Sequence, residues 1–154
     1  MTTRIRISVQ AEDFDCNAEQ SALHAGDGEV GAIVSFTGLV RDQVQGKALS
    51  SLYLEHYPGM TEQSLQHIAE QAAERWPLQA VRIIHSIGPL APLDRIVLVL
   101  AASAHRQAAF DACAFIMDYL KTRAPFWKKE QSANGEAWWV DARDSDETAL
   151  HRWQ

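Results

Sequence analysis

The feature that most constrains the fold is an uninterrupted apolar segment followed directly by a long helical segment. Ile96 to Ala102 is the longest apolar run in the chain, and its length is typical of a buried strand. Ser103 then predicts the N-cap of a helix from about Ala104 to Arg123. This helix must end near Pro125, because proline lacks a backbone N–H and disfavours helical geometry in the residue before it.

Shorter patterns predict further strands and helices around this unit. Alternating or glycine-bounded apolar residues predict strands at 5–9, 31–38, 49–56, 81–87 and 136–142. Helical spacing predicts helices at 17–24 and from an N-cap at Thr61 to Trp76. A polar loop at 41–47 and a turn at 88–92 separate them. Strands and helices mix without a regular repeat, so we predict an α+β fold with a mostly antiparallel sheet and helices packed on one face.

The charge balance and the cysteines argue against several classes of protein. The chain has 14 basic and 20 acidic residues and a net charge of −6, whereas nucleic-acid binding requires a basic face. No apolar run is long enough to span a membrane, and the N-terminus lacks a signal-peptide pattern, so we expect a cytoplasmic protein without membrane contact. Cys16 and Cys113 lack disulfide or metal-ligand spacing, and the histidines are scattered, so no metal site is expected.

A cationic and aromatic segment is unusual for such an acidic chain. Residues 119–129 contain four cations and no acid. A helix C-terminus favours cations, which accounts for Lys121 and Arg123 as a solvated helix end. This explanation suits Lys128 less well, because Lys128 follows Pro125 and stands beside two aromatic residues. The pattern favours an anion pocket in which apolar walls strengthen the charges, and a solvated helix end is the alternative.

Three further cationic residues bear on this pocket. His105 and Arg106 stand at the start of the long predicted helix, where free backbone N–H groups favour an anion. Arg41 follows the strand at 31–38 and, taken alone, is weak support for a site. A straight helix separates His105 from Lys121 by roughly 24 Å, so one chain cannot easily place both in one small pocket. The protein has either two sites or one site shared across a dimer. We predict the shared site, with His105 and Arg106 of one protomer facing Lys121 and Lys128 of its partner.

Four segments that contain these residues resemble one protein family. They are residues 31–41 (GAIVSFTGLVR), 54–60 (LEHYPGM), 103–106 (SAHR) with Phe110, and 115–130 (FIMDYLKTRAPFWKKE). Together they resemble the large, catalytic subunit of molybdopterin synthase, and the resemblance extends from about Gly31 to Arg143. It implies an α+β fold with a small inserted hammerhead-type subdomain, in a single domain over residues 1–142. Residues 143–154 are expected to form a polar, mobile tail.

The resemblance also implies a reaction and partners. The family's enzyme is a sulfurtransferase of molybdenum cofactor biosynthesis, which converts cyclic pyranopterin monophosphate to molybdopterin. Two sulfurs come from the C-terminal thiocarboxylate of a small ubiquitin-like subunit that ends in Gly-Gly. A homodimer of large subunits with a small subunit at each end forms a heterotetramer, and the step needs no metal or organic cofactor. The implied site consists of catalytic Lys121 and Lys128 and of the substrate-binding residues Arg41, His105, Arg106, Phe36 and Met117.

Alternatives remain for some of these assignments. Phe36 and Met117 are at least as well explained as plain core residues. The whole chain could also be a non-catalytic dimeric scaffold that binds a ubiquitin-like tail, with the lysine pair as a carboxylate clamp. An unrelated phosphate-handling enzyme lacks support, because the sequence has no glycine-rich phosphate loop and no metal-ligand cluster.

Overall fold

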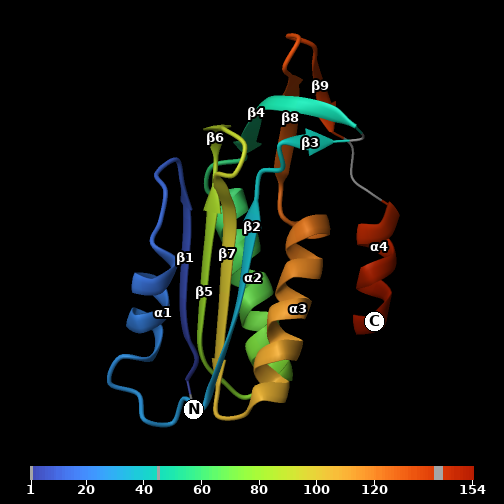
Figure 1. The fold of residues 1–154 in the computed structure, drawn as a ribbon. Helices are drawn as coiled ribbons and strands as arrows, with labels where there is room; N and C mark the ends of the chain where they lie inside the picture. The colour runs from blue at the N-terminus through green and yellow to red at the C-terminus, as the bar shows by residue number, and fades with distance from the viewer. Residues whose placement is uncertain (1, 45, 141–143) are drawn as a thin grey trace.

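Two sheets make up the framework of the protein. A computed structural model describes residues 2–44, 46–140 and 144–154 (Figure 1). The first sheet has the order β1 (Arg4–Gln10), β5 (Leu78–Ser86), β7 (Arg95–Ser103), β2 (Ala32–Leu39). Its β1–β5 pair is parallel and its two remaining pairs are antiparallel. The second sheet contains β3 (Gln43–Val44), β4 (Lys47–His56), β8 (Phe126–Ser132) and β9 (Ala137–Val140), and β6 (Gly88–Leu90) pairs with β4.

Helices cover both faces of the first sheet, although unequally. The long helices α2 (Met60–Arg75) and α3 (Arg106–Arg123) pack on one face, whereas the short α1 (Cys16–His24) lies on the opposite face (Figure 1). Successive residues of a strand point to opposite faces, so Ile83 joins the core under α2 and α3 while Ile84 joins the smaller core under α1. The predicted α+β class is confirmed, and α1 adds a helix on the second face.

The second sheet is the small subdomain that the family resemblance implies. Figure 1 shows it at one end of the first sheet, and its strands come from three separate parts of the chain. The sequence did not predict β8, because the inward positions of this strand include the charged residues Lys128 and Glu130. Two short strands, β3 and β6, lie where a loop and a turn were predicted. Pairing with β4 makes strands of segments that lack an apolar pattern of their own.

The predicted N-cap of the first long helix is wrong. Gly59, with φ 85°, is the N-cap of α2, and Thr61 lies inside the first helical turn. The Thr61 side chain is buried, accepts a hydrogen bond from the Tyr57 amide at 2.9 Å, and donates one to the Pro125 carbonyl at 3.0 Å. Thr61 therefore ties the start of α2 to the chain segment that follows α3.

The predicted N-cap of the second long helix is also wrong. His105 occupies this position, and Ser103 is the last residue of β7. The buried Ser103 hydroxyl donates to the Pro77 carbonyl at 2.7 Å, which links the ends of two elements far apart in sequence. In both cases a tertiary hydrogen bond recruited a hydroxyl that local pattern assigned to a cap.

The C-terminal segment is helical and packs against the long helices. It consists of α4 (Asp144–Leu150) and a final 3₁₀ turn, η1 (His151–Trp153). Leu150 is fully buried, and the ring of Trp153 packs edge-on against those of Trp76 and Phe115 at 5.5 and 5.6 Å. The sequence predicted no helix here, because most side chains of this segment are polar. Mobility of the tail stays a prediction, and residues 141–143, including the end of the strand predicted at 136–142, lie outside the described residues.

Candidate active site

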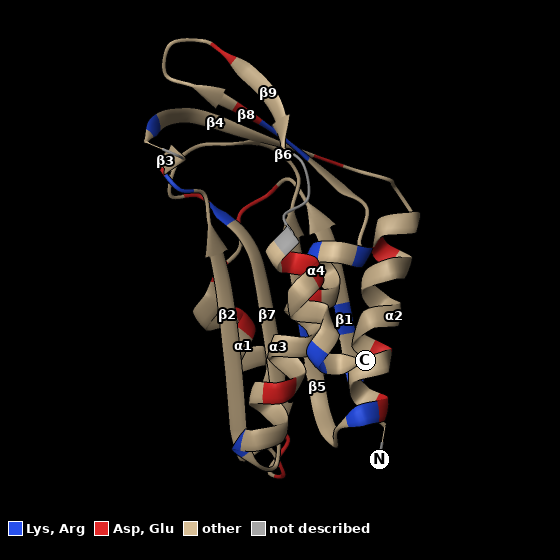
Figure 2. Ribbon diagram, turned by 90° about the vertical axis from the view of Figure 1, so that its right-hand side faces the viewer, with Lys and Arg blue, Asp and Glu red and all other residues tan. Residues whose placement is uncertain are grey.

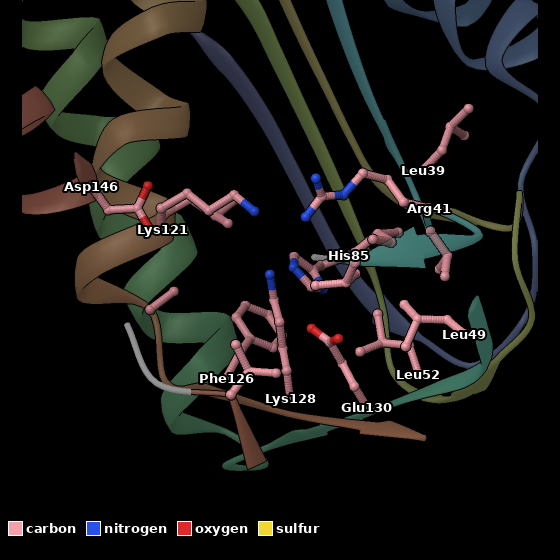
Figure 3. A pocket seen from close by; sticks show the side chains of 16 residues that line it. Leu39, Arg41, Leu49, Leu52, His85, Lys121, Phe126, Lys128, Glu130 and Asp146 are labelled. Carbon is pink, nitrogen blue, oxygen red and sulfur yellow. The ribbon is translucent and has the colours of Figure 1, made fainter. Parts of the chain in front are cut away.

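A cavity lies where the second sheet meets the C-terminal end of α3 (Figure 3). Its volume is about 350 Å³. The cavity walls include apolar side chains from β4, β8 and the segment after β2. Its polar lining consists of Arg41, His85, Lys121, Lys128, Glu130 and Asp146. Figure 2 shows basic and acidic residues interspersed along the ribbon, so this group of cations is a local feature of an acidic chain.

The reversal of the chain after α3 brings the two predicted catalytic lysines together. Lys121 is in the last turn of α3, and Pro125 directs the chain out of the helix into β8. Along β8 the residues alternate, so that Lys128 points into the cavity while Lys129 is exposed on the outer face. The Thr61 hydrogen bond to the Pro125 carbonyl holds this reversal in place. Lys121 at the helix end and Lys128 on the strand therefore line the same cavity (Figure 3).

Only some of the predicted site residues line this cavity. Arg41 lies across from the lysines, and Figure 3 shows its guanidinium directed toward the cavity centre. Exposed His105 and Arg106 stand at the opposite end of α3. Two other residues also lie elsewhere: Phe36 is 40% exposed on the edge strand β2, and Met117 is 9% exposed in the core under α3. The prediction that one chain does not collect all of these cations in a single pocket agrees with this arrangement.

Sequence reasoning missed His85, which β5 places on the cavity wall. Its ring is 4% exposed and stacks on Phe126 with 3.7 Å between ring centroids. The Nδ1 atom lies 2.8 Å from the Ser86 carbonyl, to which it donates a hydrogen bond. Burial, with a smaller contribution from the nearby charges of Lys121 and Lys128, lowers the pKa of His85 from 6.5 to about 3. The ring is therefore neutral at pH 7, and its Nε2 can only accept a hydrogen bond.

Glu130 is the second cavity residue that sequence reasoning did not single out. Its side chain is 7% exposed, and Oε2 makes no hydrogen bond with any described residue. The signal that could have found it is the two-residue alternation from Phe126 through Lys128 to Glu130, which is recognisable only once β8 is known to be a strand. Among the described residues, no group of three or more His, Cys, Asp or Glu is placed to hold a metal ion.

The buried His85 predicts a stability that depends on acidic pH. Because its pKa falls from 6.5 to about 3 on folding, His85 binds a proton between these pH values in the unfolded chain but not in the folded chain. This contribution to stability is therefore intact above pH 6.5 and is lost between pH 6.5 and pH 3, by about 1.4 kcal/mol for each pH unit. Urea unfolding between pH 7 and pH 4 should show a shallower loss for His85→Gln than for wild type. The exposed His67→Gln control should follow wild type, and equal slopes for all three proteins would contradict the assignment.

Comparison with known proteins finds close relatives over nearly the whole chain. The family model described as MoaE protein matches residues 9–123. The molybdopterin synthase catalytic subunit of Vibrio cholerae serotype O1 is 57% identical over 149 residues, which cover 97% of this chain and 98% of that protein. The structure of a molybdopterin biosynthesis MoaE protein from Burkholderia ambifaria has a TM-score of 0.82 at 50% identity, covering 99% and 98% of the two chains. A Helicobacter pylori complex of subunits 1 and 2 of molybdopterin-converting factor matches in fold, with a TM-score of 0.71 at 19% identity over 90% and 91% of the chains.

Proposed function

Because this chain belongs to the MoaE protein family, we propose that it is the catalytic subunit of a molybdopterin synthase. The observation that carries this proposal is the convergence of Lys121, Lys128 and Arg41 on one partly apolar cavity. Relatives such as the Vibrio cholerae protein bear this function in their names and match the chain over nearly its whole length. The cavity residues supply the chemistry that such an enzyme needs.

The reaction brings two anions together in this cavity. The proposed sulfur donor is the C-terminal thiocarboxylate of a small ubiquitin-like subunit, and the acceptor is cyclic pyranopterin monophosphate. Their mutual repulsion is costly unless cations share the site, and a planar guanidinium such as that of Arg41 suits a phosphate. Sulfur attack on a pterin carbon builds charge on oxygen and requires proton transfer, for which a lysine in a partly dry site is suited. We assign these roles to Lys121 and Lys128, with Lys121 nearer the reacting acyl carbon.

A small partner subunit fits the cavity's position at the molecular surface. The Helicobacter pylori protein of the same fold was solved as a complex of two subunits of molybdopterin-converting factor. For this chain we propose that the partner's Gly-Gly tail enters the cavity between α3 and the second sheet. A cytoplasmic location stays a prediction; no helix in the described part of the chain is long and apolar enough to cross a membrane.

We further propose that the complete site is shared across a homodimer. His105 and Arg106 lie at the far end of α3 from the cavity, so they can contribute to catalysis only in a partner's cavity or at a separate site. A substrate phosphate bound by these residues of one protomer would then face the lysines of the other. The N-terminal end of α3 adds free backbone N–H groups suited to the same anion.

Mixing two inactive variants tests the shared site. If a site takes Lys121 from one protomer and Arg106 from its partner, a heterodimer of Lys121→Ala and Arg106→Ala chains has one doubly mutated site and one intact site. Random re-association should make about half of the dimers mixed, and each mixed dimer has one intact site of its two. The mixture should therefore show about a quarter of the wild-type turnover per site at saturating substrate. The mixture of Arg106→Ala with the double variant Lys121→Ala/Arg106→Ala is the control and should stay inactive. No recovery in dimers shown to have exchanged subunits would contradict sharing.

Turnover with defined components tests the proposed function itself. The purified chain, a small subunit carrying a C-terminal thiocarboxylate and cyclic pyranopterin monophosphate should together yield the dithiolene product. A matched reaction with the carboxylate form of the small subunit should yield none. Tight binding of the small subunit without product would instead favour the non-catalytic scaffold.

A further inference from the structure

The floor of the cavity combines two hydrogen-bond acceptors with the surrounding cations. Figure 3 shows the Glu130 carboxylate and the His85 ring directed toward the same space as the Lys128 ammonium. The His85 Nδ1 atom is engaged by Ser86, which leaves Nε2 as an acceptor on the cavity wall. Glu130 adds a carboxylate whose Oε2 has no hydrogen-bond partner among the described residues. This part of the cavity is suited to binding hydrogen-bond donors of a ligand, whereas Arg41 and Lys121 are suited to binding an anion.

The backbone holds Glu130 firmly in this position. It lies on β8, between β4 and β9, where it is opposite Leu52 on one side and Trp138 on the other. Its neighbours in the strand point outward, so alternation directs the carboxylate inward. A side chain on the middle strand of three has little freedom to turn toward solvent, and only 7% of it is exposed.

Such an arrangement is costly unless a ligand completes it. A buried carboxylate oxygen without a hydrogen bond loses its hydration and gains nothing in return. Oε2 of Glu130 makes no hydrogen bond with a described residue, although three cationic residues line the same cavity. A buried polar group left without a partner in this way is typical of a site whose partner arrives with the substrate.

We propose that Glu130 determines specificity for the pterin ring by pairing with the donor edge of its aminopyrimidinone half. This inference rests on the proposed function, because it assumes a pterin substrate. A pterin presents a ring N–H and an exocyclic amino group side by side, and one carboxylate accepts from both in the same plane. His85 Nε2 offers a further acceptor beside this pair. The substrate then lies with its donor edge toward Glu130 and its anionic groups toward the cations.

The proposal differs from a simpler role for Glu130 as a counter-charge to the lysines. A counter-charge would change the affinity for every anionic ligand by the same factor, whatever ring the ligand carries. A donor-recognising carboxylate discriminates between rings that differ only at this edge. Lumazine provides that difference, because it has a carbonyl oxygen in place of the 2-amino group of a pterin and would point an acceptor at the carboxylate.

The experiment compares two fluorescent ligands that carry the same anionic group. Pterin-6-carboxylate and lumazine-6-carboxylate are titrated into wild type and into Glu130→Gln, Glu130→Asp and Glu136→Gln. Wild type should bind the pterin at least about 10-fold more tightly, since hydrogen bonds to a charged group have effects of this size. Glu130→Gln should lose the preference through weaker pterin binding alone. Glu136 is exposed and outside the cavity, so Glu136→Gln should keep the preference.

Each outcome decides for or against the proposal. Equal binding of the two ligands by wild type, no binding of either, or an unchanged preference in Glu130→Gln would overturn it, as would a proportional change for both ligands. Thermal unfolding checks that the variants fold. Glu130→Asp keeps the negative charge but places the carboxylate closer to the backbone, so this variant should show a reduced preference for the pterin even if Glu130→Gln does not fold. Turnover of wild type with the thiocarboxylated subunit is measured separately. Turnover without a ring preference removes this inference alone, and a ring preference without turnover removes the proposed function alone.

Discussion

Lys121→Ala is expected to lower turnover by about 100- to 10,000-fold, the usual contribution of a positioned general acid or base. Lys121 lies in the last turn of α3 and lines the cavity. The side chain is exposed, so its removal should leave the fold intact. Single-turnover formation of the dithiolene, with the small subunit in excess, measures the chemical step directly.

Lys129→Ala is the matched control for this experiment. Lys129 follows Lys128 on β8 but points to the outer face, where its ammonium lies 5.8 Å from the centre of the Trp139 ring. Lys129 has the same charge as Lys121 and lies on the same strand as Lys128, yet it is outside the cavity. Its loss should leave the rate of the chemical step within about twofold of wild type, since exposed substitutions have small effects. Comparable rates for Lys121→Ala and wild type would remove Lys121 from the catalytic group.

Phe115→Ala should produce the largest loss of stability. Phe115 is 1% exposed on α3, and its ring contacts those of Trp76, Tyr119 and Trp153 at centroid distances of 5.4, 4.5 and 5.6 Å. Replacing a buried phenylalanine with alanine leaves a cavity and costs about 3–5 kcal/mol. This is a large share of the stability of an ordinary domain, which is about 5–15 kcal/mol. Urea unfolding followed by circular dichroism measures the change.

Phe110→Ala provides the matched comparison on the same helix. Its side chain is 57% exposed, so the same chemical change should alter the unfolding free energy by no more than about 0.5 kcal/mol. The tryptophan fluorescence of Phe115→Ala should also change, because Trp76 and Trp153 both lose their contact with the missing ring. Equal losses for the two variants would mean that the aromatic cluster does not anchor the C-terminal segment to α3.

Local pattern was sufficient for the elements that bury a regular apolar face. The apolar run before residue 103 predicted β7, and Pro125 predicted the end of α3, each to within a few residues. The charged segment around Lys121 and Lys128 was also recognisable, because a cluster of cations without an acidic residue is unusual in a chain with a net negative charge. Helix length alone indicated that His105 lies far from the lysines, since the rise per residue is fixed by the backbone hydrogen bonds.

Tertiary structure decided which residues share the cavity. Sequence distance says nothing about the approach of β5, β8 and the segment after β2, which together bring His85 and Glu130 beside Arg41 and the lysines. Neither β8 nor the C-terminal helix has an apolar pattern of its own. Each is stabilised instead by pairing or packing against other elements, which the sequence pattern does not reveal. The amino-acid sequence by itself determined the strongly periodic elements and the unusual cations, whose causes are local. The acceptors on the cavity floor have a cause that is not local: their positions follow from the strand pairing that directs them inward.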